Sequence, residues 1–214
     1  RAALAVAFQG LLRSAEYCLR INVKFDPRKH LVRSDIVELT SERMVIMMTP
    51  CKNMKQLSGK NSPLVIGGGG KYIDAVAEVK NMLRVDPTPP NAACFTPLFR
   101  VPSTNSPLCY DTVLSTIRNL MLEVGENPDQ FGTHSMRIGG ATALFAMGAD
   151  ETVIKTMGRW CSDIHRLYVR ACFERCCEWT KMAGSVVVTD VAQIFDFDDH
   201  GDGEGESETS SSTF

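Results

Sequence analysis

Residues 134–170 read HSMRIGGATALFAMGADETVIKTMGRWCSDIHRLYVR, and this stretch decides what the rest of the sequence predicts. His134 and Arg137 stand three residues apart, so on a helix they share one face and can bind one anion together. Trp160 follows Arg137 by 23 residues, and Tyr168 follows Trp160 by eight. The stretch therefore combines two cationic side chains, an indole and a phenol.

Glycines and aspartates divide this stretch into three predicted helices. The helix that begins near His134 continues through Ala141–Gly148, where Gly148 is a typical stop signal. Asp150–Met157 is a second, short helix, which Gly158-Arg159-Trp160 ends. Asp163 is the expected N-cap of a third helix that carries Tyr168. Three helices folded back on each other bring these side chains together, and a phenol beside a cationic site indicates a nucleophile for a phosphodiester.

The motifs HSMR and GRW, with the tyrosine that follows, resemble the C-terminal signature of the tyrosine recombinase (phage integrase) family. The sequence of these motifs most resembles that of the Crypton and DIRS-like recombinases of eukaryotic mobile elements. The resemblance implies an upstream catalytic arginine in a context like LLR-x-x-E, which here is Arg13. It also implies a lysine on a β-hairpin, for which Lys52 is the first candidate and Lys55 and Lys60 are alternatives.

The resemblance implies a site-specific DNA recombinase or integrase that cuts and rejoins strands through a 3′-phosphotyrosyl intermediate. Two arginines would bind the non-bridging oxygens, a tyrosine would attack, and a lysine would protonate the leaving oxygen. Since the phosphotyrosine keeps the bond energy, neither ATP nor a metal nor any other cofactor is expected. The implied catalytic residues are Arg13, Lys52, His134, Arg137, Trp160 and Tyr168.

The charge distribution is compatible with a polyanionic partner. The sequence has 23 Lys and Arg against 25 Asp and Glu, but seven of the acids lie in residues 196–214, where no Lys or Arg occurs. Residues 1–195 therefore carry 23 bases against 18 acids, a net charge of +5. The family resemblance implies double-stranded DNA as the partner, a homo-oligomer (tetramer) on it, and a nuclear location. The apolar run Ala2–Leu12 is too short to span a membrane.

Other functions fit parts of this pattern. A catalytically inactive DNA-binding protein derived from a mobile element would keep the fold without the chemistry, and a type IB topoisomerase-like enzyme would share the chemistry. A metal site is a further alternative, because three side chains recur at helical spacing: His165, Cys172 and Cys176. Buried free cysteines are common, and the eight cysteines show no CxxC spacing, so reduced thiols are expected instead.

The sequence predicts a mainly helical α+β fold with a small antiparallel sheet or hairpin in its N-terminal third. Helices are expected at Ala2–Leu19, Tyr72–Val85 and Tyr110–Val124. Strands are expected at Leu31-Val32, Ile36-Val37, Met44–Met48 and Pro63–Ile66, and a short one at Leu98–Val101. The predicted organisation is a catalytic domain at 1–185, truncated at its N-terminus, a docking segment at 186–197 and an acidic disordered tail at 198–214.

Overall fold

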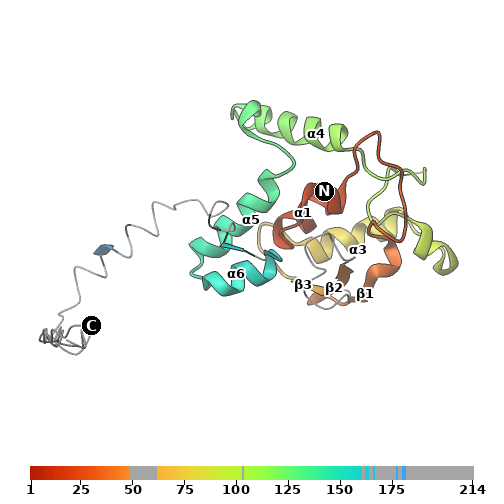
Figure 1. Ribbon diagram of the computed structural model, residues 1–214, viewed down its shortest axis with the longest axis horizontal. Helices are drawn as coiled ribbons and strands as arrows, with labels where there is room; N and C mark the ends of the chain where they lie inside the picture. Colours follow the sequence, from red (N-terminus) through yellow and green to blue (C-terminus); the bar gives the residue numbers. More distant parts are fainter. Residues whose placement is uncertain are drawn as a thin grey trace, which may run out of the picture. The chain divides into compact units, whose positions relative to one another are not determined.

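The computed structural model describes residues 1–48, 62–102 and 104–160, together with residues 162, 163, 166, 177, 180 and 181. The helices and strands named below lie in the compact unit Arg1–Phe173 (Figure 1). In chain order they are α1 Ala2–Gln9, α2 Ser14–Tyr17, η1 Arg33–Asp35, β1 Ile36–Leu39, β2 Arg43–Met48, β3 Ser62–Gly67, α3 Ala75–Val85, η3 Pro90–Phe95, α4 Tyr110–Glu123, η4 Pro128–Gln130, α5 Ser135–Ala146 and α6 Glu151–Met157. The predicted mainly helical α+β fold is confirmed.

The three strands form one antiparallel sheet in the order β1-β2-β3. Strands β2 and β3 pair without a break, from Arg43 opposite Gly67 to Met48 opposite Ser62. Two strand predictions were wrong. Val32 makes only an isolated bridge to Pro97, and the segment at Leu98–Val101 contributes only the bridge from Arg100 to Pro107. Both are pairings within loops, and they lie outside the sheet.

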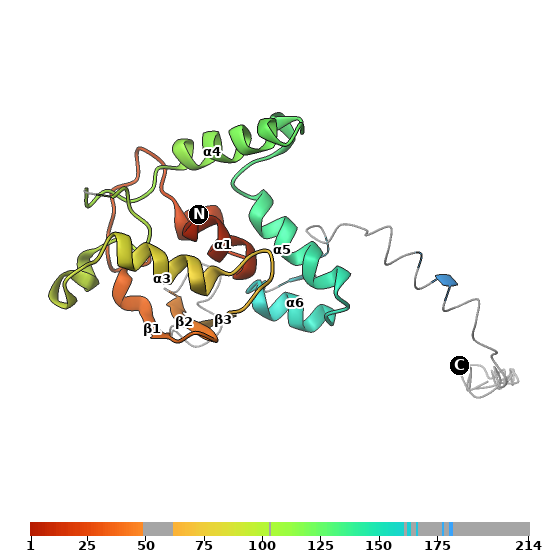
Figure 2. The ribbon, with the colours of Figure 1, turned by 180° about the vertical axis from the view of Figure 1, so that it is seen from behind.

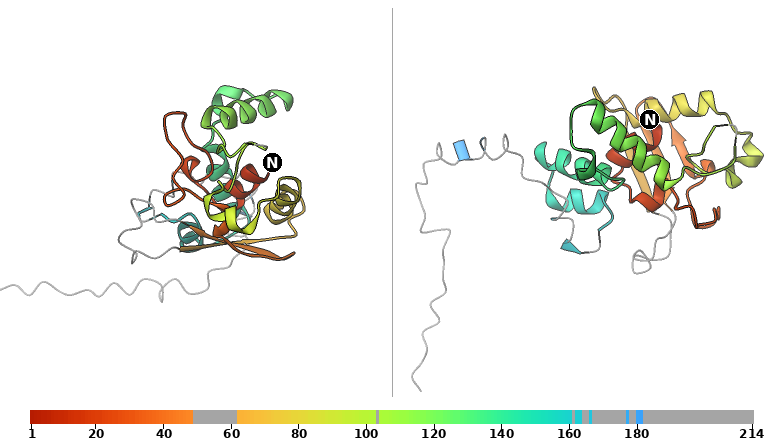
Figure 3. Two further views of the ribbon diagram at one scale, coloured as in Figure 1. Left: turned by 90° about the vertical axis from the view of Figure 1, so that its right-hand side faces the viewer. Right: turned by 90° about the horizontal axis from the view of Figure 1, so that it is seen from above.

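One face of the sheet builds the hydrophobic core. Met44, Ile46 and Met48 alternate along β2 and are buried, as are Leu64 and Ile66 on β3. Side chains of α1 and α3 join this cluster, because both helices pack on the same face of the sheet. Figure 2 shows α3 lying along the strands, and the left panel of Figure 3 shows the strands nearly edge-on with α1 and α3 on one side. The core thus fixes α1, which leads directly into the predicted site.

The predicted helix Ala2–Leu19 is broken, and this corrects the predicted setting of Arg13. Helix α1 ends at Gln9, and Leu11 adopts a left-handed backbone conformation with φ of 49°. Gly10 lets the end of α1 lie close to β3, because a Cβ there would approach the Leu64 side chain to 2.9 Å. The chain restarts as α2, and Arg13 is its N-cap residue. Arg13 therefore stands at a helix start, where its backbone and side chain are both held by Glu16.

The other predicted helices agree with the structure to within about a turn, and α3 begins at Ala75 instead of the predicted Tyr72. Asp74 caps α3 by accepting from the backbone N–H of Ala77, and Asp150 caps α6 by accepting from Thr152. Gly148, with φ of 83°, ends the turn after α5. No helix among the described residues has the length and apolar character that crossing a bilayer requires.

Candidate functional site

Three of the predicted site residues come together where α1 and α2 meet α5. Arg13 is the N-cap residue of α2, His134 is the N-cap residue of α5, and Arg137 lies in the first turn of α5. Trp160 follows α6 after the two-residue turn Gly158-Arg159. The pairing of α5 with α1 and with α6 brings these distant positions together (Figure 1).

Glycines let α5 approach α1 closely. A Cβ at Gly140 would lie 2.1 Å from the carbonyl oxygen of Phe8 and 2.5 Å from a methyl group of Leu11. A Cβ at Gly139 would lie 3.1 Å from the Phe8 ring. Because the two backbones nearly touch, Arg137 is carried to the turn at Leu11, and the pair Gly139-Gly140 thus helps to build the site.

Arg137 is the most buried of the predicted site residues that the structure describes. It is 1% exposed, and its guanidinium donates to the main-chain carbonyls of Leu11 and Gly158, the latter at 2.6 Å. These two bonds use two of its five N–H donors. Arg137 therefore joins the turn after α1 to the turn after α6, a structural role that the sequence did not predict.

Trp160 packs against this guanidinium. The carbon between the Arg137 nitrogens lies 4.0 Å from the centroid of the Trp160 ring, a cation–π arrangement. Gly158 makes the room, since a Cβ there would lie 1.7 Å from the Trp160 ring. Trp160 is 8% exposed and belongs to a small cluster with Leu11, Ala141 and Ile154. The indole thus fixes the plane in which the Arg137 fork lies.

Arg13 is oriented by Glu16 and by the chain after α6. Its Nη1 donates to the Glu16 carboxylate at 3.2 Å, and its Nη2 donates to the carbonyl of Arg159 at 3.1 Å. The Arg13 backbone N–H also donates to Glu16, at 2.7 Å. Its side chain remains 29% exposed, so Arg13 is both anchored and reachable from solvent.

His134 lies in the positive field of these arginines. Burial lowers the pKa of His134 below its ordinary value, and the charges of Arg137 and Arg13 lower this pKa further. A neutral imidazole at pH 7 keeps one nitrogen as a donor and one as an acceptor. This arrangement is suited to binding an anion between two guanidiniums while a neutral histidine exchanges a proton.

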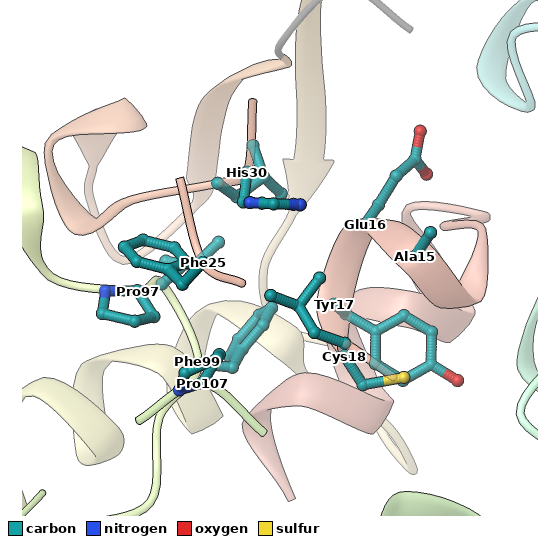
Figure 4. A pocket seen from close by; sticks show the side chains of 12 residues that line it. Ala15, Glu16, Tyr17, Cys18, Phe25, His30, Pro97, Phe99 and Pro107 are labelled. Carbon is teal, nitrogen blue, oxygen red and sulfur yellow. The ribbon is translucent and has the colours of Figure 1, made fainter. Parts of the chain in front are cut away.

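Helix α2 also positions the segment before His134. The Tyr17 hydroxyl donates to the carbonyl of Thr133 at 2.6 Å, and both residues are buried. Burial, with smaller contributions from Cys18 and Tyr110, raises the pKa of Tyr17 well above its ordinary range, so the phenol remains a donor. Figure 4 shows the Glu16 carboxylate and the Tyr17 ring leaving α2 in different directions. This four-residue helix thus supports both Arg13 and His134.

Arg159 is a site residue that the sequence analysis did not identify. It lies between Gly158 and Trp160 in the GRW motif, and its φ is 54°. Its guanidinium forms an ion pair with Glu16 at 3.0 Å and donates to the carbonyls of Gly10 and Met157. Its position inside the GRW motif could have identified Arg159, but the prediction used only the glycine and the tryptophan on either side of it.

An open cavity of about 330 Å³ borders Arg13. Arg20, Lys29 and His30 line it together with Arg13 and Glu16. The basic side chains on its wall place further positive charge beside the exposed part of Arg13. The cavity is therefore a suitable approach path for a polyanion.

The remaining predicted site residues lie outside the described residues. These are Lys52 with its alternatives Lys55 and Lys60, the nucleophile Tyr168, and the alternative metal ligands His165, Cys172 and Cys176. The helix predicted after Asp163 also lies outside them, although the Asp163 carboxylate itself binds Lys155 at 2.7 Å. Within the described part of the chain, no three His, Cys, Asp or Glu side chains gather as a metal site requires.

Comparisons with known proteins identify the fold. No family model and no curated protein sequence matches the chain. Among solved structures, it is similar to the XerH site-specific recombinase bound to palindromic difH substrate in a post-cleavage complex, with 16% identity, a TM-score of 0.56, and coverage of 86% of this chain and 45% of that one. It is similar to the XerA recombinase, with 19% identity, a TM-score of 0.53, and coverage of 85% and 55%.

A third similar structure is the Tn1549 transposon integrase in complex with circular intermediate DNA, with 12% identity, a TM-score of 0.50, and coverage of 84% of this chain and 56% of that one. The chain thus spans about half the length of each of these proteins. It has the fold of a tyrosine recombinase catalytic domain.

Proposed function

We propose that this protein is a site-specific DNA recombinase or integrase that cuts and rejoins DNA through a 3′-phosphotyrosyl intermediate. The observation that carries the proposal is the convergence of Arg13, His134 and Arg137 beside Trp160, from elements that are distant in the sequence. The fold supports it, since the similar structures include recombinases bound to their DNA substrates.

The chemistry explains why these residue types belong together. A phosphodiester is already anionic, and its pentavalent transition state places more charge on the non-bridging oxygens. Guanidiniums fixed in advance stabilise that charge without reorganisation, and they remain charged throughout the reaction. Arg13 and Arg137 are held by backbone carbonyls, so their forks are oriented before the substrate arrives. The neutral His134 is suited to accept or return a proton in this positive environment.

In this proposal Tyr168 is the nucleophile and Lys52 is the proton donor. The Tyr168 oxygen forms a bond to phosphorus, its proton leaves to a base or water, and the bond to the 5′ oxygen breaks as Lys52 protonates that oxygen. A second 5′-hydroxyl then reverses these steps and restores the phosphodiester. These steps balance in atoms and charge without ATP or a metal ion.

The proposal also includes the setting of the reaction. A protein of this kind would act on double-stranded DNA as a homo-oligomer, and the resemblance to Crypton and DIRS-like recombinases suggests a mobile element and a nuclear location. The basic wall of the cavity beside Arg13 supports a DNA partner.

The test is covalent capture of DNA. A pool of nicked duplexes with randomised sequence is mixed with the protein, and the mixture is denatured in detergent. The nick lets the short 5′-hydroxyl strand diffuse away, so a single attack leaves a trapped adduct. We expect an adduct with the wild-type chain, none with Tyr168→Phe, and an unchanged amount with Tyr72→Phe, since the Tyr72 side chain is 87% exposed.

Each outcome decides between functions. Capture by Tyr168→Phe at the wild-type level would move the nucleophile elsewhere. If DNA is bound but neither the wild type nor any variant captures it, the protein would instead be a non-catalytic DNA-binding protein. Relaxation of supercoiled DNA without strand exchange would identify a topoisomerase-like enzyme.

A further inference from the structure

The Arg159 side chain connects the segment from the end of α1 to α2 with the end of α6. Its Nη1 donates to the carbonyls of Gly10 and Met157 at 3.2 and 3.1 Å. Its Nη2 donates to Leu11 at 3.5 Å and to the Glu16 carboxylate at 3.0 Å. One side chain therefore connects the end of α1, the start of α2 and the end of α6.

This arrangement costs stability. Arg159 has a left-handed backbone, which is unfavourable for a residue with a Cβ. Its side chain is 7% exposed, and its buried Nε atom has no hydrogen-bond partner among the described residues. A buried guanidinium is expensive to desolvate, and stability alone would be served as well by apolar side chains. These two costs in stability indicate that Arg159 has a role in the site.

The groups that Arg159 contacts or provides also hold the Arg13 side chain. Glu16 Oε2 accepts from Arg159 and from the Arg13 backbone, while Oε1 of the same carboxylate accepts from Arg13 Nη1. The main-chain carbonyl of Arg159 accepts from the other end of the guanidinium, Arg13 Nη2. Arg13 is thus held on one side through a carboxylate that Arg159 fixes, and on the other side by Arg159 itself.

We propose that Arg159 is a positioning residue, which fixes the Arg13 guanidinium in the orientation needed to bind the phosphate of a DNA strand. The inference rests on the proposed function. Without the Arg159 guanidinium, the Glu16 carboxylate would lose the ion pair that fixes it, and a carboxylate and a guanidinium three residues apart hold each other weakly. Because misplaced catalytic groups lose much of their effect, the loss of Arg159 slows strand cleavage while DNA binding is retained.

The first test measures the rate of covalent capture at saturating nicked DNA in a single turnover. Arg159→Gln should slow capture by about 10- to 100-fold, with the dissociation constant for DNA unchanged within about twofold. In an Arg13→Lys background, Arg159→Gln should add little further loss, because the group that it positions is gone. Arg43→Gln is the matched control, since Arg43 is an exposed arginine paired with Glu38. Equal fold-losses in both backgrounds would overturn the inference.

The second test needs no catalysis. In protein labelled with ¹⁵N-arginine and free of DNA, the Arg13 Nε–Hε signal is identified by its loss in Arg13→Lys. We expect this signal to be sharp and slow to exchange with water in the wild type, and broad or fast-exchanging in Arg159→Gln. An unchanged signal would refute the positioning role. A restrained Arg13 in a wild-type chain that never captures DNA would refute the proposed function alone.

A second variant covers the case in which Arg159→Gln does not fold. Glu16→Gln breaks the same connection from α2 and leaves Arg159 in place. It should produce the same loss of capture rate and the same change in the Arg13 signal. If Glu16→Gln folds and shows neither effect, Arg159 does not act through Glu16, and the inference is wrong.

Discussion

The guanidinium of Arg13 donates to the main-chain carbonyl of Arg159 at 3.1 Å, across a sequence separation of 146 residues. The preceding carbonyl, that of Gly158, accepts from Arg137 at 2.6 Å. Two consecutive peptide carbonyls thus orient the two arginines assigned to the phosphate. Small changes in the turn after α6 should therefore alter both guanidiniums together, and several predictions rest on this geometry.

Gly158→Ala should displace Trp160. The added Cβ would lie 1.7 Å from the Trp160 ring, so the indole must leave its place over Arg137. Overpacking of this kind costs about 2 kcal/mol of unfolding free energy, measurable by urea denaturation. In a Trp179→Phe background, Trp160 is the remaining tryptophan, and its fluorescence should shift to longer wavelength. Gly67→Ala is the control, because a Cβ there meets nothing within 4 Å. Equal stability of the two variants would contradict the packing.

Arg137→Lys should separate the structural from the chemical role of Arg137. Arg137→Ala would leave the carbonyls of Leu11 and Gly158 without their buried donor, and we expect it to lose about 3 kcal/mol of stability. The lysine variant keeps the positive charge, so it should fold. It loses the planar guanidinium that can bind two oxygens at once, so it should capture DNA at least ~100-fold more slowly than the wild type. Arg84→Lys, at an exposed helical position, is the control. A folded Arg137→Lys protein with normal capture would place the phosphate elsewhere.

His134 should make stability depend on pH near neutrality. Its folded pKa is lowered by burial, Arg137 and Arg13, so above its ordinary value of about 6.5 both states are neutral and it contributes nothing. As the pH falls below about 6.5 the unfolded chain takes up the proton first, and the free energy of unfolding should decline. Urea denaturation at several pH values should show this decline in the wild type and in His30→Gln, and a smaller one in His134→Gln. An identical decline in all three proteins would assign the titration to other groups.

Asp86 should stabilise the fold through two arginines outside the candidate site. Its carboxylate accepts from Arg33 at 2.5 Å and from Arg100 at 2.7 and 2.8 Å. Hydrogen bonds from Arg100, and then from Arg33, lower the pKa of Asp86 to about 2. Since the folded pKa is depressed, this stabilisation is present above about pH 4 and is lost as the pH falls toward 2.

Asp86→Asn tests this network. Arg33 is almost fully buried, so removing its charged partner should lower the free energy of unfolding by about 3 kcal/mol at pH 7 and remove part of the acid dependence. Asp129→Asn, at an exposed pair with Arg118, should leave stability nearly unchanged. A small effect of Asp86→Asn at pH 7 would show that Arg33 finds another partner.

Local signals in the sequence predicted most of the elements. The N-cap at Asp150, the stop at Gly148 and the alternation along β2 depend on neighbouring residues, and each is confirmed. The break after α1 could not be predicted in this way. The left-handed turn at Leu11 presents its carbonyl to Arg137 and Arg159, which follow more than 120 residues later. An apolar run alone favours a continuous helix there.

The candidate site was likewise predicted only in part. His134, Arg137 and Trp160 were predicted from the resemblance of the HSMR and GRW motifs, and the structure brings them beside Arg13. The supports of these residues were missed. Tyr17 was not among the predicted site residues, yet its hydroxyl holds the peptide before His134, and Arg159 was passed over within its own motif. Tyr17 acts through a backbone carbonyl, which carries no signature in the sequence.

The connection between Arg13 and Arg159 also sets an order of events during synthesis. A ribosome that adds about 5 to 20 residues per second needs roughly 7 to 30 seconds to proceed from the first arginine to the second. During this interval the nascent chain holds α1 and the sheet, but Arg13 has no carbonyl of Arg159 to bind. A growing polypeptide can therefore complete its core well before it acquires an oriented anion site, and ribosome-bound intermediates that end before Gly158 should be unable to hold the phosphate of DNA.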